Sequence, residues 1–203
     1  MESVSKKLAC LHEELESCRK CALPDVGPHR YSGKAGNRIM LVGQAPASAA
    51  NSKGMPCSGS AGRRLFEWLK TAGFEEEEFR EKAYMTSITK CYPGPNPSGK
   101  GDRKPGKEEI AACRGFLLRE LDIIRPGLLI PVGQLAISIL VGDYKLSETV
   151  GRKFDHEFDG WSTVIVPLPH PSGASLWNNL PENKELVSQA LRLIADLKKE
   201  LNL

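Results

Sequence analysis

Residues 38–42 read RIMLV and are followed directly by Gly43, and this short apolar run decides the fold class. A run of that length between polar residues and a glycine predicts a strand that is buried on both faces. Three similar runs follow: Tyr84–Ile88 (YMTSI), Gly127–Val132 (GLLIPV) and Thr163–Leu168 (TVIVPL). Segments with helical spacing of apolar residues separate them, at 61–72, 108–125 and 134–141. This alternation predicts an α/β fold with a central, mostly parallel four-stranded sheet and helices on both faces.

The flanking segments complete a single domain over residues 1–203. Residues 3–17 and 183–201 carry apolar residues at helical spacing, which predicts a first and a closing helix. Residues 154–161 are expected to form a hairpin at the edge. Residues 92–107 contain four Pro and four Gly, and this composition predicts a loop without regular structure.

The composition is that of an ordinary globular domain. The 203 residues are 40% hydrophobic and 26% charged. No apolar run approaches the roughly 20 residues that cross a bilayer, and residues 1–15 lack the apolar core of a signal peptide. We therefore expect a cytoplasmic, monomeric protein with no membrane partner.

Basic residues are grouped along the chain, although the net charge is only +3. The groups are Lys6/Lys7, Arg19/Lys20, Arg63/Arg64 and a loop group of Lys100, Arg103, Lys104 and Lys107. Such groups can follow a nucleic-acid backbone. A lysine-rich loop is more often only a solvated surface, so the charge pattern leaves both interpretations open.

Four of the six cysteines have the spacing of a metal site. Cys18 and Cys21 form a C-x2-C pair, and Cys91 and Cys113 flank the proline-rich loop. Four thiolates in this arrangement suit either zinc or an iron–sulfur cluster, and the spacing does not choose between them. The alternative is that Cys91 and Cys113 are ordinary buried thiols. Cys10 lies on the apolar face of the first predicted helix and is expected in the hydrophobic core.

Three polar segments follow predicted strands directly, and they are residues 43–51, 87–91 and 170–175. In open, largely parallel sheets ligands bind beyond the carboxyl ends of the strands. The three segments are therefore expected to converge on one cleft.

Four motifs in these segments occur in the order of a known family. They are Gly43-Gln44-Ala45-Pro46, residues 54–62 (GMPCSGSAG), residues 86–91 (TSITKC) and His170-Pro171-Ser172. Together with the cysteines, over roughly residues 10–180, they resemble the iron–sulfur uracil-DNA glycosylases known as family 4. The resemblance implies a base-excision-repair enzyme that cleaves the N-glycosidic bond of uracil or another deaminated base in DNA and leaves an abasic site.

The resemblance also implies the cofactor and the roles of individual residues. Cys18, Cys21, Cys91 and Cys113 would hold a [4Fe-4S] cluster, carried on residues 1–25 and 88–115, with zinc as the alternative. His170 would donate a hydrogen bond to the departing base, and the backbone of Gln44 and Ala45 would lie against the base and the attacking water. The substrate-binding residues would be Gly43, Cys57, Ser87, Ser58, Ser60 and Ser172.

Each role has a structural alternative. His170 could cap a buried turn, and residues 58–62 could be a plain helix cap. Trp177 could be a wedge beside the damaged strand or an aromatic side chain packed on the last helix. Residues 100–107 could be a DNA lid or a disordered loop.

The sequence departs from the family at positions that read the base. Cys57 stands where the family has a stacking phenylalanine, and Ser87 where it has an asparagine that reads the Watson–Crick edge. Ala45 is as in family 4 and offers no carboxylate to activate water, whereas Gln44 replaces a glutamate and Ala47 replaces a glycine. These changes predict a roomier, less selective pocket. They also leave open a catalytically weak, DNA-binding or damage-sensing protein, whereas a zinc-stabilised nucleotide hydrolase is disfavoured because no acidic cluster follows any strand.

Overall fold

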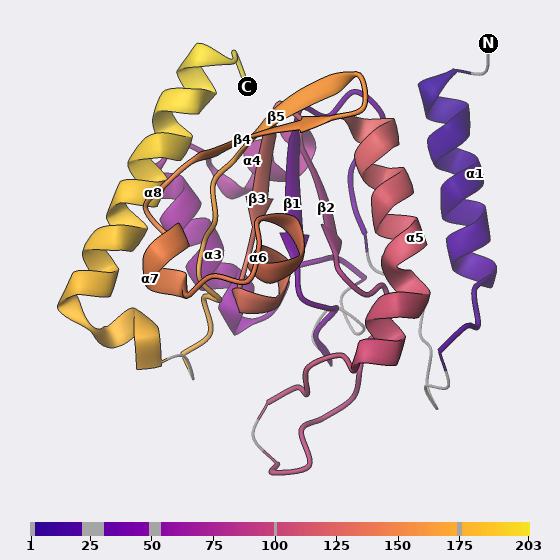
Figure 1. Ribbon diagram of the computed structural model, residues 1–203, viewed down its shortest axis with the longest axis horizontal. Helices are drawn as coiled ribbons and strands as arrows, with labels where there is room; N and C mark the ends of the chain where they lie inside the picture. Colours follow the sequence, from indigo (N-terminus) through magenta and orange to yellow (C-terminus); the bar gives the residue numbers. More distant parts are fainter. Residues whose placement is uncertain (1–2, 22–30, 49–53, 100, 174–175) are drawn as a thin grey trace.

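The computed structural model describes residues 3–21, 31–48, 54–99, 101–173 and 176–203. Its centre is a five-stranded sheet in the order β2-β1-β3-β5-β4 (Figure 1). The strands are β1 (Ile39–Gly43), β2 (Ala83–Ser87), β3 (Leu128–Pro131), β4 (Phe154–Phe158) and β5 (Trp161–Ile165). The first three and β5 are parallel, and only β4 runs antiparallel, against β5.

The predicted α/β class is confirmed, but the predicted count of four strands is wrong by one. The strand β5 serves both as the second arm of the expected hairpin and as the expected fourth strand, because it pairs with β3 on one side and with β4 on the other. The strand β4 is therefore an antiparallel edge added to the parallel sheet, a common arrangement in such folds. Only its first and last residues are half-buried, so β4 lacks the continuous apolar run that marks the inner strands.

The helices are α1 (Val4–Ser17), α3 (Ser60–Thr71), α4 (Glu76–Lys82), α5 (Lys107–Ile124), α6 (Gln134–Leu140), α7 (Leu146–Thr149) and α8 (Pro181–Glu200), with a 3-10 turn at Leu176–Asn179. Of these, α4 and α7 were not predicted. The acidic run of α4 lies in its first turn, where carboxylates are favoured by the helix dipole, and Phe79 anchors the helix in the core. None of the described helices is long and apolar enough to cross a membrane.

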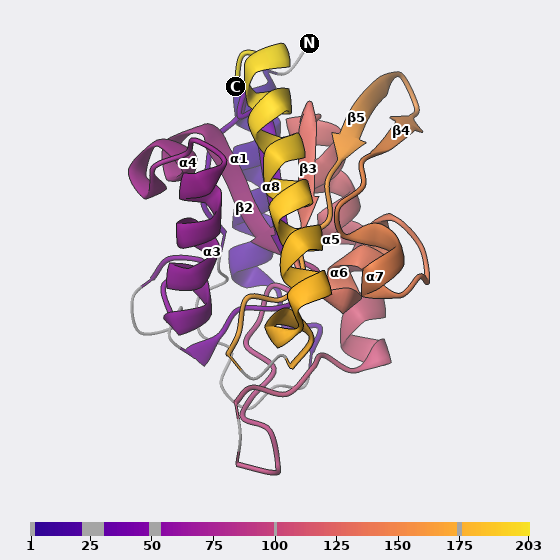
Figure 2. The same ribbon diagram turned by 90° about the vertical axis from the view of Figure 1, so that its left-hand side faces the viewer.

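Alternating residues of the strands pack against different helices. Ile39 and Leu41 contact a core formed with α3, α4 and α8. Met40 and Val42 point the other way, toward α1, α5 and α6. The two views show the resulting three layers, with α3 and α8 on one side of the sheet and α1 and α5 on the other (Figures 1 and 2).

Strand register brings the polar segments to one edge of the sheet. Gly43 and Ser87 are direct partners at the carboxyl ends of β1 and β2. A parallel bridge between Val132 and Leu168 continues this edge beyond β3 and leads the chain to His170 two residues later. Residues 92–99 and 101–106 extend past this edge, away from the two termini (Figure 1). They are not without structure, because Pro95 and Asp102 form an antiparallel bridge.

Candidate active site

A cavity of about 110 Å³ lies at the carboxyl ends of β1 and β2. Its wall is formed by Leu41, Gly43, Gln44, Ala45, Pro46, Ala47, Pro56, Cys57, Ser58, Gly59, Ala61, Gly62, Leu65, Thr86, Ser87, Val132, His170 and Pro171. The three polar segments therefore converge as predicted. The wall is mainly apolar with a few polar groups, as in sites that bind a small organic group.

Hydrogen bonds beyond the strand ends fix the floor of the cavity. The Ile88 amide donates to the Gly43 carbonyl at 2.9 Å, and the Thr89 amide donates to the Gln44 carbonyl at 3.3 Å. These bonds continue the β1–β2 pairing into the turn that follows Ser87. The segments that carry Gln44 and Ser87 are thus held against each other by the backbone.

His170 lines the cavity and has a defined tautomer. The Ser172 amide donates to its Nδ1 at 3.2 Å, so the neutral imidazole carries its proton on Nε2. The Asn178 side chain donates to the His170 carbonyl at 2.8 Å and holds the backbone. Desolvation by the surrounding walls, and secondarily the charge of Lys104, lower the pKa of His170. The residue is therefore a neutral Nε2–H donor at neutral pH.

Cys57 lies in a strained and crowded turn. Its φ of 55° is in the left-handed region, and its carbonyl oxygen lies 1.7 Å from where a Cβ on Gly62 would be. Only glycine fits at position 62. Arg80 donates to the carbonyls of Pro56 (3.0 Å) and Cys57 (3.4 Å), and burial raises the pKa of the Cys57 thiol to about 11. The thiol is thus a neutral group that lines the cavity and also contacts the core.

The serines are placed unequally. Ser58 lines the cavity and donates to the Met55 carbonyl at 2.9 Å. Ser60 is the first residue of α3 and Ser172 contacts His170 through its amide, and within the described residues neither lines the cavity. Trp177 is half-buried against the core that α8 covers, which supports the structural alternative for this residue.

The four predicted metal ligands line a second, small cavity between the end of α1 and the start of α5. Cys91 and Cys113 are buried, and Cys18 and Cys21 are half-buried. Burial, then the negative charge of the Cys113, Cys21 and Cys18 thiolates, raises the pKa of Cys91 to about 12. Among the described residues, no three or more His, Cys, Asp or Glu side chains are placed so as to hold a metal ion.

The prediction that Cys10 belongs to the core is wrong, because its thiol is exposed. Leu8 and Leu11 of the same helix are buried. Cys10 lies two residues after Leu8, which is about 200° around the helix and away from the buried face.

The basic loop is organised by an ion pair that the sequence analysis missed. Both guanidinium nitrogens of Arg103 bind the Glu109 carboxylate, at 2.9 and 2.5 Å, and Glu109 also accepts from the Gly106 amide at 2.7 Å. Arg103 therefore tethers the loop to the start of α5. Lys104 and Lys107 are exposed. Lys100 lies outside the described residues.

Comparison with known proteins gives a consistent family. Residues 31–195 match the sequence model of the uracil DNA glycosylase superfamily. A type-4 uracil-DNA glycosylase from Thermotoga maritima is 36% identical over 162 residues, 79% of each chain. One from Archaeoglobus fulgidus is 31% identical over 179 residues, 85% of each chain. A type-5 uracil-DNA glycosylase from Pyrobaculum aerophilum is 30% identical over 115 residues, 51% of this chain and 48% of that protein.

Proposed function

Because the chain belongs to the uracil-DNA glycosylase superfamily, we propose that it is a DNA glycosylase of base excision repair. It hydrolyses the N-glycosidic bond of uracil or another deaminated base in DNA and leaves an abasic site. The observation that carries the proposal is that His170, whose Nδ1 accepts from the Ser172 amide, lines a small cavity at the strand ends.

The reaction needs little assistance from the attacking nucleophile. An extruded base enters the cavity, and the C1′–N bond breaks with both electrons passing to the base. The His170 Nε2–H would donate to the oxygen on which negative charge develops, in a largely apolar site where such a bond is strong. Water then adds to C1′ of the cationic sugar and loses a proton to solvent. Ala45 has no group to take that proton, so backbone carbonyls near Gln44 would orient the water.

The serines divide between the base and the phosphate backbone in this proposal. Ser87 and the backbone of Gly43 and Gln44 would face the base. Ser58 and Ser60 lie at the start of α3, whose N-terminus favours an anion, and would contact a phosphate beside the lesion. Ser172 would act through its amide, which fixes the tautomer of His170.

We also propose that Cys18, Cys21, Cys91 and Cys113 hold a [4Fe-4S] cluster, with zinc as the alternative. The donor type fits, since four thiols line one cavity and the charge of the neighbouring thiolates disfavours the ionisation of Cys91. A multivalent cation would remove that penalty. When bound, the cluster would join the end of α1 to the start of α5 through metal–thiolate bonds. Iron, sulfide and zinc analysis of anaerobically purified protein distinguishes the two metals.

The test of the function is base release by the purified protein from oligonucleotides that carry uracil, hypoxanthine, xanthine or an alkylated base. We expect abasic sites from at least one deaminated base. His170→Ala should lower the rate of release about 100-fold or more while DNA affinity is kept, because one preorganised donor is lost. His156→Ala, a histidine on β4, is the matched control and should act like the parent protein.

The second candidate function is a damage-sensing protein that binds DNA without efficient catalysis. The replacement of two base-reading residues, at Cys57 and Ser87, favours it. Tight binding to a lesion without release of any tested base would support this function over the enzyme.

A further inference from the structure

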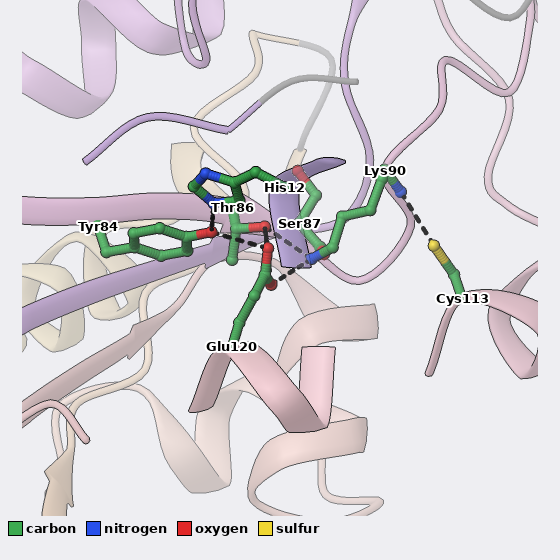
Figure 3. A network of polar contacts seen from close by, with 7 residues as sticks. All are labelled: His12, Tyr84, Thr86, Ser87, Lys90, Cys113 and Glu120. Atoms are coloured by element: carbon green, nitrogen blue, oxygen red, sulfur yellow. Dashed lines mark hydrogen bonds and ion pairs between the residues drawn. The ribbon is translucent and has the colours of Figure 1, made fainter. Parts of the chain in front are cut away.

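A lysine ammonium is fully buried next to the candidate active site, where it makes three hydrogen bonds. The Lys90 Nζ donates to Thr86 Oγ1, to the Ser87 carbonyl and to Glu120 Oε2, each at 2.6 Å (Figure 3). An ammonium has three N–H donors, so all of them are used. Lys90 and Glu120 are both 0% exposed, and their opposite charges compensate each other in the interior.

The network around Glu120 of α5 also includes residues of β2 and α1. The Glu120 carboxylate accepts from the Tyr84 hydroxyl at 3.0 Å and from Thr86 Oγ1 at 3.1 Å. The Tyr84 hydroxyl is 2.9 Å from the His12 Nε2. These polar groups, buried except for the half-buried His12, therefore connect α1, β2 and α5 (Figure 3).

Lys90 also connects the two functional regions of the chain. Its backbone amide donates to Cys113 Sγ at 3.3 Å, and Cys91 follows it in the chain. Its side chain holds the carbonyl of Ser87, which lines the candidate active site. Between these points, the Ile88 and Thr89 amides fix the carbonyls of Gly43 and Gln44. The turn from Ser87 to Lys90 is thus held by its side chain, its backbone and the cysteine segment.

We propose that Lys90 is a positioning residue for base release. Its ammonium folds the turn after β2 so that Ser87 and the Gly43–Gln44 backbone form the floor of the cavity. Lys90 does not line that cavity, so it acts through the turn and not by touching the base. The proposal rests on the proposed function.

The experiment must separate positioning from stability, because removing one partner of a buried ion pair leaves an unpaired charge. Lys90→Met alone is therefore compared with the double variant Lys90→Met/Glu120→Leu, in which neither charge remains. Replacing both members of a buried pair by apolar residues is often neutral for stability. The matched control is Arg119→Gln/Glu14→Gln, which removes an exposed ion pair between α5 and α1.

We expect the double variant to fold, to bind DNA like the parent protein and to release the base about 10- to 100-fold more slowly in single turnover, because a misplaced site loses rate. Amide hydrogen exchange at Ile88 and Thr89 should become faster in this variant and stay unchanged in the control. If the double variant melts far below the parent, amide hydrogen exchange at Ile88 and Thr89 is measured on Lys90→Arg instead. This variant keeps the positive charge, and its exchange rates then decide whether Lys90 holds the turn.

Unchanged exchange at these two amides, or an unchanged rate of base release, would overturn the positioning role. A parent protein that releases no base would instead refute the proposed function. In that case faster exchange at Ile88 and Thr89 in the variant would still support the role of Lys90 in holding the turn.

Discussion

At the scale of single residues, we propose that Ser87, which lines the cavity, sets which base is accepted. It lies at the end of β2, opposite Gly43, and is nearly buried. A serine hydroxyl can act as donor or acceptor, whereas an asparagine amide offers one of each in a fixed plane. The unspecialised hydroxyl is consistent with broad recognition of deaminated bases.

We predict that Ser87→Asn increases the preference for uracil over hypoxanthine about 10-fold, since one paired polar contact is worth roughly 1–3 kcal/mol. The measurement is the ratio of single-turnover rates on the two oligonucleotides. Ser162→Asn, an exposed residue of β5, is the control. A lower rate on uracil would indicate that serine is suited to a different base.

Replacing Cys57 by the family's phenylalanine is a less simple test than replacing Ser87. A phenylalanine there would restore a stacking face, but the turn has a left-handed backbone and the side chain contacts the core. Added volume in such a site costs about 1–3 kcal/mol. Position 57, which the resemblance matches to the family's stacking phenylalanine, is therefore packed for a small side chain in this chain.

At the scale of secondary-structure elements, the start of α3 is fitted against the Cys57 turn through Gly62. A methyl group at position 62 would collide with backbone atoms, which cannot move aside as a flexible side chain can. The closeness of α3 to the turn closes one wall of the cavity, since Gly59, Ala61 and Gly62 all line it.

We predict that Gly62→Ala lowers the free energy of unfolding by about 2 kcal/mol or more and lowers base release at least tenfold, because the turn must shift. Denaturant unfolding and single-turnover kinetics measure the two effects. Gly115→Ala is the control, because this glycine is exposed within α5 with nothing near its Cβ direction. It should stabilise the protein by about 0.5–1 kcal/mol. Parent-like activity in Gly62→Ala would contradict the fitted contact.

The elements differ in how readily the sequence predicts them. The inner strands could be predicted because both faces are apolar, and the long helices because their apolar residues recur every three to four positions. The edge hairpin at residues 154–161 was predicted, and β4 forms its first arm, but the sequence did not show that the second arm, β5, is also the parallel neighbour of β3. Four-residue α7 is too short to show a period.

The buried ion pair shows a further limit of sequence reasoning. Glu120 lies four residues after Phe116 on the buried face of α5, and that placement was a usable signal. Its partner, Lys90, is 30 residues away and could be found only by folding the chain. The candidate site, in contrast, was predictable in outline, because strand ends in a parallel sheet must converge.

At the scale of the whole molecule, the cavity is lined by residues at the carboxyl ends of β1 and β2. Residues 92–99 and 101–106 extend from the same end of the sheet (Figure 1). Lys104 lies close enough to His170 for its charge to lower the pKa of the imidazole. Arg103 is engaged by Glu109, so it should not be counted among the cations of the DNA-binding surface. Lys104 and Lys107 remain as exposed cations of this loop among the described residues.

We predict that Lys104→Gln/Lys107→Gln flattens the salt dependence of DNA binding. Each lost phosphate contact should reduce the slope of log affinity against log salt by about 0.9 on duplex DNA, so the double variant should lose up to about 2. Lys34→Gln/Lys70→Gln is the control, since these exposed lysines pair with glutamates at the opposite end of the sheet. Binding isotherms at several salt concentrations measure the slope. Equal slopes for the parent and the loop variant would show that DNA approaches the cavity from another side, and a reduced slope in the control would show that binding depends on net charge alone.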